Sequence, residues 1–355
     1  MLLGGLVYLI DIESNIMQYD FFTAKSLASA FIVCGAIIKL HLFPFNRNKF
    51  SNYTLEMNKG IIEQQFLALL PTLAILTKLI SDHALTPFSI MILFYFSLVT
   101  VFLTSLSLIV QNNVKNISRL LMHAGICIFI LHLCTGNISE AIYSFMTHTL
   151  SYLGIVAFIG IVSYKNQTKN LKELKNVKVN HPIGNICLYI LIGSGMALPF
   201  TPLAFSRYNV ILSAAFFENT TVIVSFLINV SLLILSFSIF RFFWYSSHFF
   251  KPESKELSPT IIQITTLGIL SVLIFIFFII GIPDLFIENY SFSFRELLSI
   301  QPIKIDTTSN QRKNITLMYT FAHPFLAIIV IYFLYMKKNK EGKVNDFKFK
   351  NATLF

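Results

Sequence analysis

The segment "SLASAFIVCGAIIKLHLFPFN", residues 26–46, places a lysine, a histidine and a proline inside an apolar run. The run is as long as a helix that crosses the hydrocarbon core of a membrane, which takes about 20 residues. Pro44 removes a backbone donor and clashes with the preceding turn, so the carbonyl around Leu40 loses its helical partner. Irregular backbone at membrane depth is tolerated only where it is buried in protein or lines a wet cavity. The segment therefore predicts a broken membrane helix at 23–45, with Lys39 and His41 beside the break.

The rest of the chain also has a composition suited to lipid. Of its 355 residues, 55% are hydrophobic and 12% are charged, and the mean hydropathy is +0.70, whereas soluble domains carry about 25% charged residues. Further apolar spans lie at 61–81, 87–110, 117–136, 139–164, 183–206, 208–217 joined to 220–247, 260–283 and 317–336. They lack the period-two alternation of barrel strands. We predict an all-α polytopic membrane protein with about nine to ten transmembrane helices.

The net charge of +10 is distributed unevenly along the chain. Eighteen Lys and Arg residues fall in alternate loops, at 46–60, 111–119, 165–181, 248–258 and 337–355. The opposite loops hold only five. This asymmetry follows the positive-inside rule and places the basic loops on the cytoplasmic or matrix side. The charge is thus interpreted as a topology signal and a lipid-surface contact, and a role in binding nucleic acid is excluded.

Several titratable residues lie inside the apolar spans, where insertion of a charge costs roughly 2.5–3.5 kcal/mol. Lys78 is near a span end and is expected to extend to the interface, as are Glu63 and Arg241. His132, near an outer end, is interpreted as a structural polar residue. His123, His148 and Lys39 lack such an explanation, and imidazole can take up and release a proton near neutral pH. We list as candidates for a proton path Lys39, His123, His148, Arg207, Lys78 and His41.

A second broken region, "GMALPFTPLAFSRYN" at residues 195–209, has two prolines inside an apolar run, followed directly by Arg207. Two Pro-interrupted segments, each beside a cation, indicate a duplicated architecture. The four cysteines show no metal-ligand spacing. No catalytic triad, phosphate loop or cofactor motif is found, so neither a cofactor nor a metal is expected.

Four segments resemble the antiporter-like membrane subunits of respiratory complex I and of Mrp-type cation/proton antiporters. They are "IIKLHLFPFN" (37–46), "QNNVKNISRLLMHAG" (111–125), "AIYSFMTHTLSYLGIVAFIGIVS" (141–163) and "MALPFTPLAFSRYNVI" (196–211). The first is similar to the F-K-x-x-x-x-P-F-H of the family's broken helix, with Lys39 on the family's lysine. The third is similar to Y-x-x-x-Y-T-L-x-x-L-G-A-F, with His148 on the second tyrosine. Tyr152 stands where the antiporter type has lysine, so the likeness is greatest to subunit N of NADH:quinone oxidoreductase, the counterpart of mitochondrial subunit 2.

The chain also departs from the family pattern. The family's helices before the sixth, and the glutamate that they supply, have no counterpart here. Thr72 replaces a lysine of the family, and Lys78 either substitutes for it or extends to the interface. The resemblance divides the chain into a remnant of a first inverted helical repeat (1–86), a second repeat (87–250), C-terminal helices (251–336) and a basic tail (337–355).

The resemblance implies a non-catalytic, proton-translocating subunit of NADH:quinone oxidoreductase that couples electron transfer elsewhere in the complex to proton transport. A subunit of an Mrp-type antiporter and a structural subunit that no longer conducts remain open alternatives. The expected partners are other membrane subunits, lipid and a separate chain that supplies the missing helices. The expected location is a bacterial plasma membrane or a mitochondrial inner membrane.

Overall fold

The chain folds into a bundle of helices. The computed structural model describes residues 24–45, 69–166, 170–171, 177–179, 182–198, 201–216, 222–246, 255–257, 260–286 and 329. The helices are α2 (Ala24–Lys39), α4 (Leu70–Ser81), α5 (Pro87–Val110), α6 (Val114–Cys134), α7 (Ile138–Asn166), α8 (Pro182–Gly195), α9 (Pro202–Phe216), α10 (Val222–Ser246) and α11 (Ile261–Phe286). Two three-residue strands, β1 (Val177–Val179) and β2 (Lys255–Leu257), pair in parallel. The predicted all-α membrane fold is confirmed.

Four helices are long and apolar enough to cross a membrane within the described residues. They cover Pro87–Val110, Val114–Cys134, Ile138–Ile161 and Ile261–Ile279. Shorter apolar helices cover Leu70–Ser81, Ile183–Gly195 and Phe226–Arg241. The predicted span at 317–336 and the residue Glu63 lie outside the described part, apart from residue 329. The chain is therefore a multi-pass membrane protein.

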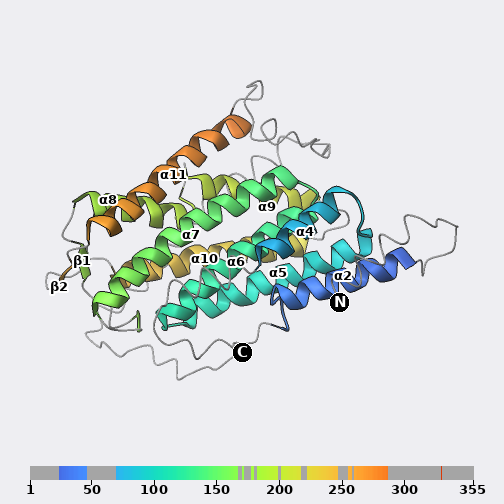
Figure 1. Cartoon of the computed structure of the whole chain (residues 1–355), viewed down its shortest axis with the longest axis horizontal. Helices are drawn as coiled ribbons and strands as arrows, with labels where there is room; N and C mark the ends of the chain where they lie inside the picture. Colours follow the sequence, from blue (N-terminus) through green and yellow to red (C-terminus); the bar gives the residue numbers. More distant parts are fainter. Residues whose placement is uncertain are drawn as a thin grey trace.

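Helices α6 and α7 form the centre of the bundle. Helix α6 packs mainly against α5 and α7, α10 runs beside α5, and α11 covers α7, α8 and α9. Figure 1 shows the helices roughly aligned with one another, with α11 along one edge and α2 toward the opposite edge. Elements that are far apart in sequence thus meet around α6 and α7.

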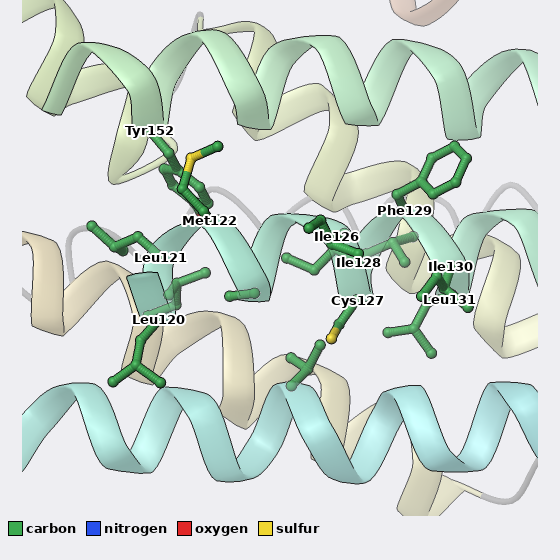
Figure 2. Packing of buried hydrophobic residues seen from close by; sticks show 14 of the residues in the cluster. Leu120, Leu121, Met122, Ile126, Cys127, Ile128, Phe129, Ile130, Leu131 and Tyr152 are labelled. Atoms are coloured by element: carbon green, nitrogen blue, oxygen red, sulfur yellow. The ribbon is translucent and has the colours of Figure 1, made fainter. Parts of the chain in front are cut away.

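The burial of α6 explains why it forms the core. From Leu120 to Cys134 every residue of this helix is buried. Figure 2 shows Cys127 directed toward one neighbouring helix, while Met122 and Phe129 lie on the side of Tyr152. The Phe129 ring meets Phe145 of α7 edge to face, with centroids 5.2 Å apart. A helix that is apolar all round is expected inside a bundle, where each face has its own partner.

The basic loops described in the structure lie at the same end of the bundle. Asn113 forms an antiparallel bridge with Asn170, and the Leu171 amide donates to the Asn112 carbonyl at 2.8 Å. The β1–β2 pairing joins the loop before α8 to the loop before α11. The segments after α5, after α7 and after α10 therefore meet, as the alternating charge pattern predicted.

The predicted spans at 183–206 and at 208–217 joined to 220–247 need a correction. Helix α8 ends at Gly195 and α9 begins at Pro202, so the boundary lies at the proline pair and not after residue 206. Proline suits the first turn of a helix because the amide that it lacks has no partner there. Residues 202–216 are consequently a separate helix, and α10 starts at Val222.

Candidate functional site

The first broken helix is closed by backbone hydrogen bonds where α2 ends. His41 has φ +55°, a left-handed conformation that reverses the chain. Its amide donates to the Ile38 carbonyl at 3.2 Å, and the Leu42 amide donates to the Ile37 carbonyl at 3.0 Å. This pair of bonds is a Schellman motif, which satisfies two of the last carbonyls of a helix. Neither bond supplies a donor to the carbonyls of Lys39 and Leu40.

His123 supplies a partner for one of these carbonyls from α6. Its Nε2 lies 3.1 Å from the Leu40 carbonyl oxygen and donates to it. The sequence predicted that Pro44 leaves this carbonyl without its helical donor, and the structure shows which side chain replaces that donor. On the other side of the break, the Phe43 amide donates to Thr100 Oγ1 of α5 at 2.9 Å. The break is therefore tied to two neighbouring helices.

The second broken helix ends in the same way. Ala197 has φ +58° and its amide donates to the Ser194 carbonyl at 2.8 Å. The Leu198 amide donates to the Gly193 carbonyl at 3.0 Å, which completes a second Schellman motif. As in α2, the two carbonyls that follow, here those of Gly195 and the next residue, need donors from elsewhere.

Arg207 of α9 provides these donors. Its Nη2 donates to the Gly195 carbonyl at 3.0 Å, and its Nη1 donates to the Met196 and Leu232 carbonyls, each at 3.4 Å, and to Ser236 Oγ. Ser236 Oγ also donates to the Met196 carbonyl at 2.9 Å. The guanidinium thus caps the C-terminus of α8 and joins it to α10.

The burial of Arg207 makes this arrangement energetically demanding. The residue is 1% exposed, and a guanidinium keeps its charge in proteins. No carboxylate pairs with it in the described part of the chain. The C-terminal end of a helix carries roughly half a negative charge, so the α8 carbonyls compensate part of the positive charge. The positive charge of Arg207 is therefore stabilised by the carbonyl dipoles at the end of α8 and by the Ser236 hydroxyl.

His148 of α7 lies on the same side of the bundle as Arg207. It is 1% exposed, and its Nδ1 is 2.8 Å from the Ser144 carbonyl oxygen and 3.3 Å from Ser144 Oγ. Ser206 Oγ donates to Ser144 Oγ at 2.8 Å, which links α9 to α7. His148 and Arg207 interact electrostatically, and the His148 ring meets the Tyr152 ring edge to face at 5.5 Å. These residues form a buried polar cluster within an apolar bundle.

The structure divides the six predicted residues into three groups. His148 and Arg207 belong to the buried cluster just described. His123 and His41 lie at the α2 break and interact electrostatically, with Lys39 beside them at the end of α2 on an exposed position. Lys78 belongs to neither group. The role of all six in proton transfer stays a prediction.

Lys78 is exposed near the end of α4. Its Nζ lies 3.0 Å from Asp82 Oδ1 and Oδ2, and the side chains are 75% and 49% exposed. The hydrogen bond from Lys78 holds the pKa of the Asp82 carboxyl below its usual value. The position fits the expectation that Lys78 extends to the interface.

Two further residues belong to the buried cluster. His132, interpreted as a structural polar residue, is 0% exposed and its Nε2 lies 3.2 Å from the Ser206 carbonyl oxygen, which fits that interpretation. Tyr152, noted only for replacing a family lysine, is 0% exposed and interacts electrostatically with Arg207. The available signal was helical spacing, since Tyr152 lies one turn after His148.

Arg241 has a different place from the one predicted. It was expected to extend to the interface, but it is partly buried and caps the C-terminus of α5. Its Nη1 donates to the carbonyls of Leu108 (3.4 Å), Ile109 and Gln111 (3.3 Å), and its Nη2 donates to Asn112 Oδ1 at 2.6 Å. The guanidinium thus supplies donors to carbonyls at the end of α5 that have no partner within the helix.

The sequence matches a family model described as "NADH:quinone oxidoreductase/Mrp antiporter, TM" over residues 2–234. Among solved structures, the chain is similar to a chain of the membrane-bound sulfane sulfur reductase, an archaeal respiratory membrane complex. The TM-score is 0.65 at 18% identity, and the likeness covers 80% of this chain but 60% of that one. No curated protein matches the sequence.

At this identity the structural likeness shows the fold alone, whereas the family model covers most of the chain. Both broken helices and the buried cluster fall within the matched residues 2–234. The chain belongs to the NADH:quinone oxidoreductase/Mrp antiporter transmembrane family.

Proposed function

We propose that the chain is a proton-translocating subunit of a multi-subunit respiratory membrane complex of the NADH:quinone oxidoreductase type. The observation that carries this proposal is the buried cluster of His148, Tyr152 and Arg207 inside an apolar bundle. Titratable groups at membrane depth are costly and typical of proton paths. Lys39, His41 and His123 at the α2 break extend the proposed path, and their roles are taken from the family. Lys78 stays a candidate at the exposed end of α4.

A partner chain completes the bundle in this proposal. Lys39 is exposed at the end of α2, next to Ile38, which is 46% exposed. A lysine on an apolar face needs a polar neighbour when the face is in the membrane. A helix of another membrane subunit with an acidic side chain would meet this need.

The test uses the membrane complex that contains the full chain, reconstituted into vesicles. Replacement His148→Ala is expected to lower proton flux by about tenfold, which corresponds to a barrier higher by ~1.4 kcal/mol. His83→Ala is the control, because His83 is an exposed histidine that follows α4. Unchanged flux in the assembled His148→Ala complex would favour the non-conducting structural role.

A second candidate function is that of a subunit of a cation/proton antiporter, because the family description names both types. The two functions differ in their energy source. A respiratory subunit translocates protons when NADH is oxidised, whereas an antiporter exchanges sodium for protons in vesicles that receive only an ion gradient. Sodium-driven proton movement without NADH would identify the antiporter.

A further inference from the structure

One carboxylate stands out among the helices of the bundle. Within helices α2 and α5 to α10, Glu140 is the only acidic residue. It lies in the first turn of α7, at the end of the bundle opposite to the basic loops. Its side chain is partly exposed, so water reaches it from that end. The bundle therefore has a single titratable acid in these helices, next to the aqueous phase.

The position of Glu140 on α7 connects it with the buried cluster. Glu140, Ser144, His148 and Tyr152 follow one another at intervals of four residues, so they lie on one face of the helix. Ser144, His148 and Tyr152 are each at most 1% exposed. From Glu140 to Tyr152 the stripe covers about 18 Å along the helix axis. One face of α7 thus carries polar side chains from the partly exposed end to the buried cluster.

Helices α6 and α9 add polar groups to the same stretch. Ser206 Oγ of α9 donates to Ser144 Oγ at 2.8 Å, and Tyr208, two residues further along α9, interacts electrostatically with Glu140. His132 of α6 lies with its Nε2 3.2 Å from the Ser206 carbonyl oxygen. Three helices therefore contribute polar side chains between Glu140 and the buried cluster.

The opposite direction along α7 is apolar. Ile155, Val156, Phe158 and Ile159 follow Tyr152 toward the basic loops, and each is at most 2% exposed. Between Tyr152 and residue 164 the helix has no titratable side chain. A charge in such packing is costly, and apolar side chains offer no group that takes up a proton. Along α7 the polar side chains therefore lead from the cluster to Glu140 and not to the basic loops.

We propose that Glu140 is the group through which the buried cluster exchanges protons with the aqueous phase at this end of the bundle. As a carboxylate, Glu140 takes a proton from a hydronium ion and leaves a water molecule. The neutral acid then passes the proton to a hydroxyl, which releases its own hydrogen to the next group. Tyr208 and Ser144 carry such hydroxyls, and the His148 imidazole is the final acceptor. The reverse sequence releases a proton.

The role of Glu140 rests on the proposed function, since it presupposes that the cluster transfers protons. A carboxylate in the first turn also stabilises a helix through the helix dipole, and this purely structural role has to be separated from proton exchange. Glu140→Gln removes the titrating group and keeps the size of the side chain. Glu140→Asp shortens the side chain by one methylene and keeps a group that titrates.

The test is proton flux in vesicles that contain the intact complex. Glu140→Gln is expected to lower the flux as far as His148→Ala does, about tenfold, while its thermal midpoint stays close to that of the wild-type chain. Glu140→Asp is expected to retain most of the flux. Glu256→Gln is the control, because β2 lies with the basic loops at the opposite end. Normal flux in Glu140→Gln, or an equal loss in Glu140→Gln and Glu140→Asp, would overturn the proposal.

A membrane-impermeant carbodiimide checks the side from which Glu140 is reached. The carboxylic acid adds to the carbodiimide, and the adduct rearranges to a stable N-acylurea without a further reactant. Added at the end opposite to the basic loops, the reagent is expected to block flux in the wild-type complex and to leave the residual flux of Glu140→Gln unchanged. Equal inhibition of the two would overturn the proposal.

The same measurements distinguish this proposal from the proposed function. If the wild-type complex and His148→Ala give the same flux, the proposed function fails and the role of Glu140 fails with it. If His148→Ala loses flux and Glu140→Gln does not, the cluster transfers protons by another route and the role of Glu140 alone is refuted.

Discussion

The cap that His123 provides on α2 leads to a prediction with two separate readouts. Replacing His123 by Leu removes the donor at 3.1 Å from the Leu40 carbonyl while keeping a side chain of similar bulk. The Schellman motif does not reach this carbonyl, and Leu40 is 0% exposed, so water cannot replace the donor. The variant leaves one buried acceptor unpaired.

The expected loss of stability follows from the free-energy cost of leaving the Leu40 carbonyl unpaired. An unpaired buried carbonyl destabilises a protein by about 1–3 kcal/mol. We expect His123→Leu to lower the free energy of unfolding by this amount and the thermal midpoint by a few degrees. His123→Gln keeps an N–H donor of comparable reach and is expected to recover most of the loss.

The assay is thermal unfolding of the purified chain in detergent, followed by fluorescence, together with proton flux in reconstituted vesicles. His123→Gln restores the cap but has no group that titrates near neutral pH. Loss of flux in a stable His123→Gln variant would assign proton transfer to His123, whereas normal flux would assign capping alone. Equal stability of His123→Leu and the wild-type chain would refute the reasoning about the Leu40 carbonyl.

Two further predictions concern packing and the outer surface. Gly154→Ala is expected to lower the free energy of unfolding by about 1–3 kcal/mol through overpacking, because the new Cβ would lie 2.3 Å from Leu191 Cδ2 and 3.0 Å from its Cγ. The result is a lower thermal midpoint. Gly268→Ala in α11 is the control: nothing lies within 4 Å of its new Cβ, so it is expected to stabilise the protein by about 0.5–1 kcal/mol. Lys78 lowers the pKa of the Asp82 carboxyl, so their pairing stabilises the folded state above the unfolded pKa of Asp82 and is lost as the pH falls through the folded pKa. Asp82→Asn should remove this part of the pH dependence in acid unfolding curves, and an unchanged curve would contradict it.

The local features of the fold could be predicted because they depend on nearby residues. Helix α5 begins and ends at the predicted residues 87 and 110, since Pro87 occupies the first turn and Thr86 caps it by accepting from the Ser89 amide at 3.4 Å. The loss of the helical donor at the Leu40 carbonyl followed from Pro44 alone. Such signals are contained in a few consecutive residues.

The contacts between helices could not be predicted in the same way. In a membrane protein both the lipid-facing and the interior faces are apolar, so hydrophobic periodicity does not show which face is inside. His132 and Arg241 were therefore interpreted from their distance to a span end, which says nothing about the carbonyls that they reach. The pairing of Arg207 with the end of α8 likewise needs the position of α9 in space.

The permanence of the charge on Arg207 has a consequence for any cation near it. A guanidinium never gives up its proton in the cell, so the middle of the bundle keeps a stationary positive potential. An incoming metal cation meets that potential as a whole charge and is repelled. A proton carries the same unit charge, so the potential of Arg207 opposes every cation in this part of the bundle.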